Sequence, residues 1–179
     1  MKDLKQFNIP FVGLKEKDYT FQYQIDLTFF KAFDYTEFEN SDVNVTLTLT
    51  KKSTLMELYF VADGTVTLPC DLTNELYDQK IEATLSLVVK FGPEFNDDNE
   101  EILILPYDAY QINVAQYIYE MIVLAVPAKR ISPKIAEGKT DSVALEKLKE
   151  LEVNNKKKGA KQPDPRWDKL KDLLTDKKT

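Results

Sequence analysis

Cysteine and histidine usage limits the chemistry that this chain of 179 residues can perform. Cys70 is its only cysteine, and it contains no histidine. A nucleophilic cysteine needs a base to take its proton, and zinc sites need several sulfur or imidazole ligands. Neither requirement is met, so we interpret Cys70 as a small structural residue at a turn and expect no stoichiometric zinc and no other cofactor. A lone cysteine forms no internal disulfide, which favours a reducing, cytoplasmic setting.

A run of carboxylates and amides at residues 97–101 is the second group with candidate chemistry. Calcium loops place oxygen ligands at alternate positions, with a glycine at the sharp turn and a closing glutamate. The run Asp-Asp-Asn-Glu-Glu lacks that spacing, so it predicts a solvated loop that helps to attract a basic protein. No convincing carboxylate pair for metal-assisted cleavage of RNA is visible, and we expect the protein not to be an enzyme.

Lysines gather before the C-terminus, at Lys156, Lys157, Lys158 and Lys161. Each could contact an RNA phosphate, and such contacts strengthen at low salt. No aromatic residue is interleaved with them, and the segment 154–163 has no apolar side chain larger than Ala160. A flexible linker is therefore the favoured interpretation, and RNA contact by these lysines is the alternative.

The single tryptophan lies beyond this linker, in the motif Asp-Pro-Arg-Trp-Asp-Lys-Leu-Lys at 164–171. Asp164 and Pro165 suit the cap and first position of a short helix over 165–174. A helix this short is marginal in water, so its apolar face needs a surface, which belongs either to the protein's own body or to a partner. The lysine-rich linker favours a partner. The contact residues are then Pro165, Arg166, Trp167, Leu170 and Lys171.

The elements that precede these groups are mostly strands. Apolar and polar residues alternate at 19–25, 43–49 and 81–91, which is the period of half-buried strands. Residues 55–61 and 65–68 flank Asp63-Gly64, a dipeptide that predicts a tight hairpin turn. A short apolar strand at 102–105 is stopped by a proline. The sequence therefore predicts an antiparallel, β-rich domain, either a sheet or a partly open barrel.

Helices are predicted over 28–38, where four phenylalanines occur, and over 112–125, where the apolar stripe is wide enough for burial on most sides. A third helix is predicted over 143–153, with Ser142 as its cap. The expected class is α+β, with one buried amphipathic helix and a helical, partly flexible C-terminal tail. The expected divisions are a domain at 1–132, a helix and linker at 133–163 and the tryptophan motif at 164–179.

Charge is unevenly distributed between these parts. Residues 1–132 carry 11 Lys and Arg against 21 Asp and Glu, whereas residues 133–179 carry 13 against 9. An acidic body repels phosphates and attracts basic proteins, so contact with RNA would have to reside in the tail. No apolar run approaches the roughly 18 residues that a membrane span needs, and we expect no membrane partner.

Several segments together resemble one family. They are residues 9–14 (Ile-Pro-Phe-Val-Gly-Leu), Pro69-Cys70-Asp71 with residues 88–91 (Val-Val-Lys-Phe), residues 124–127 (Leu-Ala-Val-Pro) and the motif at 164–171. Their order and spacing resemble the YceD family, the large ribosomal RNA subunit accumulation proteins, and most of all its Bacteroidetes-type branch. Many members carry a second cysteine three residues after the first and a later cysteine or histidine. Thr73 and Ser132 stand at those positions here, so we expect no metal site of that kind.

The resemblance implies a role in accumulation of the large ribosomal RNA and in assembly of the large subunit. In many bacteria the family's gene lies beside that of a small, basic zinc-ribbon protein of the large subunit. The expected partner is therefore a basic ribosomal protein or a large-subunit precursor, which the acidic body would suit. An RNA-binding module that uses the basic tail on ribosomal RNA is the alternative.

Overall fold

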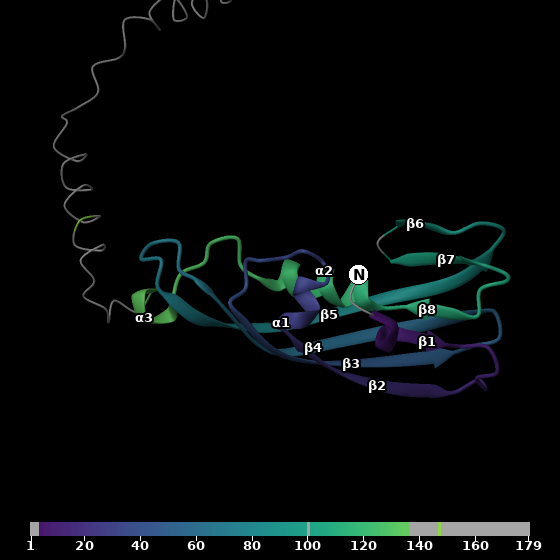
Figure 1. Ribbon diagram of the computed structural model, residues 1–179. Coiled ribbons are helices and arrows are strands. Elements are labelled where there is room, and N and C mark those ends of the chain that lie inside the picture. The colour runs from purple at the N-terminus through teal and green to yellow at the C-terminus, as the bar shows by residue number, and fades with distance from the viewer. Residues whose placement is uncertain (1–3, 100, 137–146, 148–179) are drawn as a thin grey trace, which may run out of the picture. The chain divides into compact units, whose positions relative to one another are not determined.

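The computed structural model describes residues 4–99, 101–136 and 147. The chain divides into two units, Met1–Glu137 and Gly138–Thr179. In the first unit, a curled six-stranded sheet carries two helices and a two-stranded sheet on its inner face (Figure 1). This architecture confirms the predicted α+β class. The predicted three-part division of the chain stays a prediction, and the helices predicted over 143–153 and 165–174 lie outside the described residues.

Four long strands form an antiparallel meander in the order in which they occur along the chain. They are β2 (Asp18–Asp26), β3 (Asn40–Lys51), β4 (Leu55–Pro69) and β5 (Leu76–Gly92). Alternate side chains of β3 are buried, from Val43 to Leu49, because successive residues of a strand point to opposite faces of the sheet. The strands predicted from alternation at 19–25, 43–49 and 81–91 are therefore confirmed.

The sheet continues beyond β5 with one parallel pairing. β7 (Ile102–Pro106) runs parallel to the end of β5, from Val88 opposite Ile102 to Gly92 opposite Pro106. β6 (Asn96–Asn99) pairs with β7 and ends the sheet. The predicted loop at 97–101 is therefore wrong for Asp97–Asn99. An edge strand with every side chain exposed has no apolar alternation by which a sequence reveals it.

The predicted hairpin turn at Asp63-Gly64 is also wrong, because both residues lie inside β4. Gly64 pairs with Val43, and a Cβ atom added to it would lie 2.2 Å from the Asp42 carbonyl oxygen. A glycine is thus required here because the backbone of β3 approaches closely, which is a common reason for a glycine inside a strand. The turn into β4 occurs earlier, where Lys52 N–H donates to the Leu55 carbonyl at 3.0 Å.

The helix predicted over 112–125 is shorter and less buried than expected. η1 (Leu4–Phe7) leads into β1 (Asn8–Pro10), which pairs with β8 (Gln111–Asn113), so Ile112 belongs to a strand. α2 (Ala115–Ala125) follows, and the Asn113 side-chain oxygen accepts from Ala115 N–H at 3.0 Å. Its buried residues are Ala115, Ile118, Met121 and Ile122. Leu124 is 83% exposed, so α2 is buried on one side only.

α1 (Leu27–Lys31) covers another part of the inner face and is much shorter than the predicted helix over 28–38. Asp26 ends β2 and caps α1, because its carboxylate accepts from Thr28 N–H at 2.9 Å and from Phe29 N–H at 3.2 Å. Phe38 lies beyond the helix but is buried with it, in edge-to-face contact with Phe30. The phenylalanines correctly indicated burial, but the chain reaches Phe38 through turns rather than through a helix.

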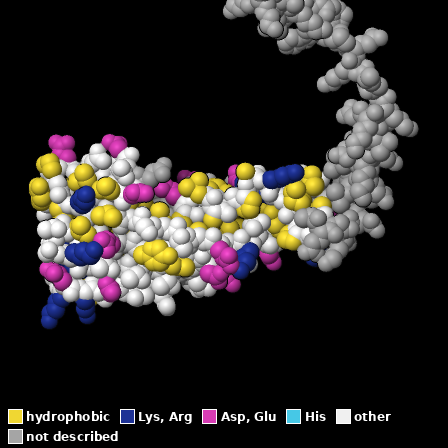
Figure 2. Space-filling view, turned by 180° about the vertical axis from the view of Figure 1, so that it is seen from behind, with side chains coloured by type: hydrophobic (Ala, Val, Ile, Leu, Met, Phe, Trp, Pro, Cys, Tyr) yellow, Lys and Arg dark blue, Asp and Glu magenta, His cyan; other side chains and the backbone are white. Residues whose placement is uncertain are grey.

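The outer face of the sheet carries mostly polar side chains, with charged residues such as Glu57 and Asp63 and the partly exposed Tyr59 and Val61 among them. Thr46 and Thr48 of β3 lie opposite Gln22 and Thr20 of β2. Figure 2, which views the molecule from behind, shows white atoms over much of its surface, with charged and hydrophobic side chains among them. The threonine and glutamine side chains hydrogen-bond readily to water, so this face needs no further layer.

Candidate partner-binding surface

The residues that the sequence singles out for binding lie outside the described part of the chain. This holds for the partner-contact set Pro165, Arg166, Trp167, Leu170 and Lys171 and for Lys156, Lys157, Lys158 and Lys161. Beyond residue 136, the structure describes only Lys147, which is helical and exposed. Binding by the C-terminal segment therefore stays a prediction, and the described residues offer a different surface.

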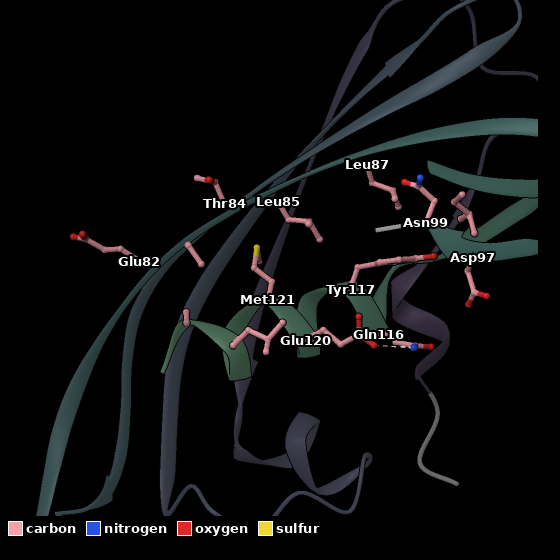
Figure 3. Close-up of a pocket in the computed structure, with 14 residues that line it drawn as sticks. Glu82, Thr84, Leu85, Leu87, Asp97, Asn99, Gln116, Tyr117, Glu120 and Met121 are labelled. Atoms are coloured by element: carbon pink, nitrogen blue, oxygen red, sulfur yellow. Dashed lines mark hydrogen bonds between the residues drawn. The ribbon is translucent and has the colours of Figure 1, made fainter. Parts of the chain in front are cut away.

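A groove of about 550 Å³ lies between β5 and α2 (Figure 3). Residues Glu82–Leu85 and Leu87 of β5 form one wall, and residues of β6 and β7 close one end. The other wall is the side of α2 that runs from Met121, at the edge of the buried stripe, to the exposed Leu124. Its lining there consists of Gln116, Tyr117, Glu120, Met121, Leu124 and Ala125.

The middle of the groove is apolar. Leu85 and Leu87 come from alternate positions of β5 that face the helix, and Met121 approaches them from α2 (Figure 3). Leu124, one turn further along α2, leaves most of its side chain in water. An exposed leucine alone is unremarkable on a protein surface, but one that borders an apolar groove extends a candidate binding site.

The charged residues that line the groove are all acidic: Glu82, Asp97 and Glu120. Glu120 accepts a hydrogen bond from the Gln116 side-chain amide at 2.9 Å, which holds its carboxylate at the rim. Burial raises the pKa of Tyr117, and the negative charges of Asp97 and Glu120 raise it further, so this phenol stays neutral at physiological pH. The groove therefore combines an apolar floor with a negative field.

Cys70 lies at the far end of β4, in a turn that is joined to the segment after α2. Its side chain is buried. Burial raises the pKa of the thiol, but backbone N–H groups of Ser132, Leu72 and Thr73 point to the sulfur, and together they lower the pKa below its ordinary value. Thr73 and Ser132, which stand where many family members carry a further cysteine or histidine, thus lie near Cys70.

The turn carries no set of groups suited to catalysis or to metal. Backbone N–H groups of Ser132 and Thr73 lower the pKa of the thiol, and the chain contains no imidazole to act as a base. Among the described residues, no three Cys, Asp or Glu side chains come close enough together to hold a metal ion. The interpretation of Cys70 as a structural residue at a turn fits this geometry.

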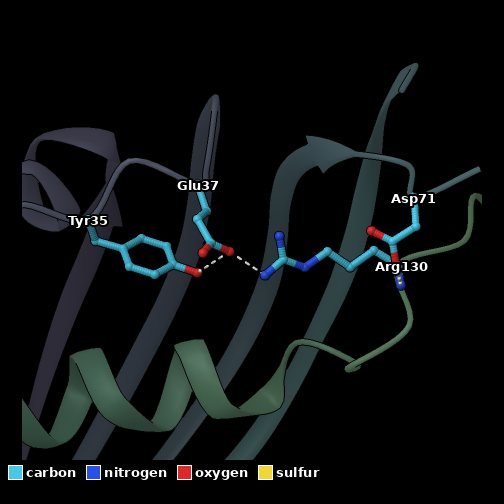
Figure 4. Close-up of polar contacts among 4 residues, drawn as sticks. All are labelled: Tyr35, Glu37, Asp71 and Arg130. Atoms are coloured by element: carbon cyan, nitrogen blue, oxygen red, sulfur yellow. Dashed lines mark hydrogen bonds and ion pairs between the residues drawn. The ribbon is translucent and has the colours of Figure 1, made fainter. Parts of the chain in front are cut away.

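Asp71 and Arg130 strengthen the same junction (Figure 4). Asp71 N–H donates to the Arg130 carbonyl, and Arg130 N–H donates to the Asp71 carboxylate, both at 2.8 Å. The Arg130 guanidinium also pairs with Glu37, which accepts a hydrogen bond from the Tyr35 hydroxyl at 3.3 Å. Burial, and then the charge of Glu37, raise the pKa of Tyr35 to about 12. These contacts hold three segments together without offering a reactive group.

Comparison with known proteins assigns the chain to a family. Residues 58–174 match the family described as Large ribosomal RNA subunit accumulation protein YceD. The chain belongs to the YceD family. The predicted resemblance is confirmed, and three of its four parts lie inside the match, whereas residues 9–14 precede it. No curated protein and no solved structure matches this YceD chain. In the part of the chain that the structure describes, no helix is both long and apolar enough to cross a membrane.

The groove was missed from the sequence because its two walls are far apart in the chain. One signal was present: Leu124 lies off the stripe formed by Ile118, Met121 and Ile122. An apolar residue at this position also fits a wide buried face, whereas the structure leaves Leu124 exposed at the rim of the groove. The pairing of β5 with β7 over only part of its length could not be read from either strand alone.

Proposed function

We propose that this YceD-family protein supports accumulation of the large ribosomal RNA by binding a basic ribosomal protein of the large subunit or a precursor particle. It acts in the cytoplasm, as a binding protein without a reaction of its own. Membership of the family carries the link to the large ribosomal RNA. The acidic body supports a basic partner, because complementary charge raises the rate of association and disfavours binding of other acidic molecules.

The groove between β5 and α2 supports this proposal. Its charged lining residues are carboxylates, and its floor is apolar. Ribosomal proteins must neutralise RNA phosphates, so their surfaces are rich in lysine and arginine. A site with these two properties favours such a segment over a nucleic acid, whose phosphates the carboxylates would repel.

The C-terminal motif is the second part of the proposed binding mechanism. Trp167 lies beyond a lysine-rich linker, and an aromatic residue on a tethered segment suits a binding hot spot. Two linked contacts raise the overall affinity, because the second forms within the complex that the first has made. In this proposal the body attracts the basic partner and the motif anchors it.

Direct binding of ribosomal RNA is the second candidate function. The excess of Lys and Arg over Asp and Glu in residues 133–179 favours it, and Lys156, Lys157, Lys158 and Lys161 would make the contacts. Deleting residues 154–179 separates the two candidates. It should weaken association with RNA far more than association with a basic protein, because the body keeps its net negative charge.

The decisive experiment is purification of the tagged full-length chain from its own cells, with and without ribonuclease, followed by identification of the proteins and RNA retained. We expect basic large-subunit proteins that persist after ribonuclease treatment. Depletion of the protein should lower the large ribosomal RNA relative to the small. An unchanged ratio of the two RNAs would contradict the proposal.

Trp167→Ala tests the anchor. We expect the free energy of unfolding to be nearly unchanged and association with the retained partner to weaken by about 2 kcal/mol or more. Tyr107→Ala is the matched control, because Tyr107 is an aromatic residue of the body with 74% of its surface exposed. If Trp167→Ala instead lowered stability by roughly 3 kcal/mol with binding intact, the motif would dock on the protein's own body.

A further inference from the structure

One side of β5 is left without a neighbouring strand over much of its length. β5 pairs with β4 from Leu76 to Lys90, whereas β7 pairs with its other side only from Val88 to Gly92. Among the described residues, no strand pairs with that other side between Leu76 and Leu87. Native sheets normally shield such edges, since unpaired N–H and C=O groups accept another chain.

The orientation of the unpaired groups follows from one hydrogen bond. Val88 N–H donates to the Glu101 carbonyl at 2.8 Å, so the backbone of Val88 points to the β7 side. The N–H and C=O groups of successive strand residues point to alternate sides. Glu82, Thr84 and Ser86 therefore direct their N–H and C=O groups to the free edge. At Lys80 the carbonyl already accepts from the Gln79 side-chain amide at 2.9 Å, which shields that position.

The unshielded part of the edge coincides with the groove. Four consecutive residues, Glu82–Leu85, line it. A strand that only showed one face to a groove would contribute alternate residues, so a consecutive run indicates that its edge borders the space. An added strand would thus have backbone partners on β5, the apolar side chains of Met121 and Leu124 beside it, and carboxylates around it (Figure 3).

We propose that the free edge of β5 at Glu82–Ser86 receives an extended, Lys/Arg-rich segment of a partner protein, which adds to the sheet as a strand alongside α2. Main-chain hydrogen bonds to Glu82, Thr84 and Ser86 supply affinity, and the apolar floor and the carboxylates select the side chains. The inference rests on the proposed function and deepens it, because it names the surface and the conformation of the bound segment.

Charge decides between this occupant and the others. A second copy of the chain would bring another body with 21 Asp and Glu against 11 Lys and Arg in residues 1–132, and like charges would repel. The protein's own residues 164–179 carry five Lys and Arg against four Asp, which gives little attraction, and its lysine-rich residues 154–163 have no apolar side chain larger than Ala160 with which to cover the floor. Single-stranded RNA would place phosphates beside Glu82, Asp97 and Glu120. A strongly basic protein segment suits the groove best.

The probe is a synthetic decapeptide of alternating lysine and valine, titrated into the full-length protein and followed by fluorescence anisotropy. In an extended peptide the lysine N–H groups share one edge and the valine N–H groups share the other. Methylating the N–H groups of one edge should therefore weaken binding by at least about tenfold, and methylating the other edge should have little effect. Equal effects from both would show attraction by charge alone and overturn the inference.

Protein variants test the same edge from the other side. Thr84→Pro removes an N–H that makes no ladder bond, and proline is tolerated at such edge positions. We expect at least about tenfold weaker binding of the decapeptide with an unchanged melting temperature, whereas Thr84→Val, which keeps the N–H, should bind normally. If Thr84→Pro unfolds the protein, the methylated peptides still decide.

Glu120→Lys tests the negative rim. We expect about fivefold weaker binding at low salt and a smaller difference at high salt. Glu16→Lys is the matched control, because Glu16 is exposed, lies before β2 and makes the same change in net charge. Equal losses from both variants would mean that only net charge matters, and the groove would not be the site.

Other occupants give distinct results, each of which would overturn the inference. A shift in Trp167 emission on introducing Thr84→Pro, without peptide, would identify the protein's own tail, since Trp167 is the only tryptophan. A dimer by light scattering that Thr84→Pro converts to a monomer would identify a second copy. Binding of a single-stranded RNA decamer that Thr84→Pro abolishes would identify RNA.

The same variants separate this inference from the proposed function. If Thr84→Pro retains its ribosomal partner as the unaltered protein does, the edge is not the site, but the proposed function stands. If no ribosomal protein is retained by the unaltered protein, the proposed function fails, whatever the decapeptide does.

Discussion

The outer face of the sheet and the groove beside α2 differ in how they meet water, although β5 contributes to both. The outer face carries threonine and glutamine side chains, which water satisfies. The groove combines an apolar floor with carboxylates at its rim and leaves Leu124 mostly exposed. The hydroxyl groups of a threonine-rich sheet face hydrogen-bond to water. Covering an apolar groove beside an unpaired strand edge is favourable, because it removes apolar surface from water and pairs free backbone groups. The small groove is therefore a stronger candidate for partner binding than the much larger outer face.

The largest contrast is expected on β4, where neighbouring aromatic residues face opposite ways. Phe60 is fully buried on the inner face, and Tyr59 is 48% exposed on the outer face. Phe60→Ala should lower the free energy of unfolding by about 3–5 kcal/mol through the cavity that it leaves. Tyr59→Ala should cost less than about 1 kcal/mol. Urea denaturation of both variants checks the pair, and similar losses would mean that the outer face is covered in solution.

A smaller loss is expected at Gly64, where β3 and β4 approach most closely. A methyl group there must displace the backbone at Asp42 and Val43. Gly64→Ala should therefore cost about 1–3 kcal/mol or more, as overpacking does elsewhere. Ala62→Gly, on the same face of the same strand, is the control and should cost roughly 0.5–1 kcal/mol. A neutral Gly64→Ala variant would mean that the two strands are further apart than described.

Asp26 tests how α1 is held on the inner face. Asp26→Ala removes the side-chain cap of α1 and should cost about 1 kcal/mol at neutral pH. The hydrogen bond from the Thr28 hydroxyl is the main cause that holds the pKa of Asp26 below its usual value. A lowered pKa stabilises the folded state above the unfolded pKa of about 3.9, and this contribution is lost as pH falls through the folded value. The difference in stability between the two proteins should therefore shrink in acid. A difference that persists at low pH would contradict this.

Tyr35 gives the smallest expected effect, and it is confined to alkaline pH. Its pKa is raised to about 12, so the unfolded chain, with a pKa near 10, ionises first. The contribution of this phenol to stability is complete below pH 10 and is lost as pH rises toward 12. Tyr35→Phe should remove that part of the pH dependence, with little change at pH 7. Ultraviolet titration should show that the last-ionising tyrosine is absent in the variant.

The strands could be predicted because their alternation is local. Val43–Leu49 alternates cleanly, and it is β3. The same local logic failed at Asp63-Gly64, because a dipeptide that suits a turn also suits a close strand approach, and only the partner strand decides. It failed again at Ile112, whose apolar character serves a strand as well as a helix. Both errors arise where tertiary pairing overrides local preference.

Of the candidate site, only the negative charge could be predicted from the sequence. The acidic body was visible in the composition of residues 1–132. The proximity of Ser132 to Cys70 was not predicted and became visible only in the fold. The groove exists because β7 pairs with β5 only from Val88 to Gly92. The length of this pairing cannot be predicted from the residues of β7 alone. Part of the surface of interest therefore became visible only in the fold.

The junction between Asp71 and Arg130 has a mechanical consequence. The chain leaves α2 through the segment that contains Arg130 and Ser132 and continues into α3 (Pro133–Ala136). Two hydrogen bonds join the backbone of Arg130 to Asp71, one to its N–H and one to its carboxylate, and Ser132 N–H lies near the Cys70 sulfur. Along the chain, these contacts lie between α2 and the residues after Ala136. Tension applied along the chain from beyond Ser132 would therefore load these contacts before it reached α2, so the turn after β4 lies in the path between the C-terminal segment and the helix that walls the groove.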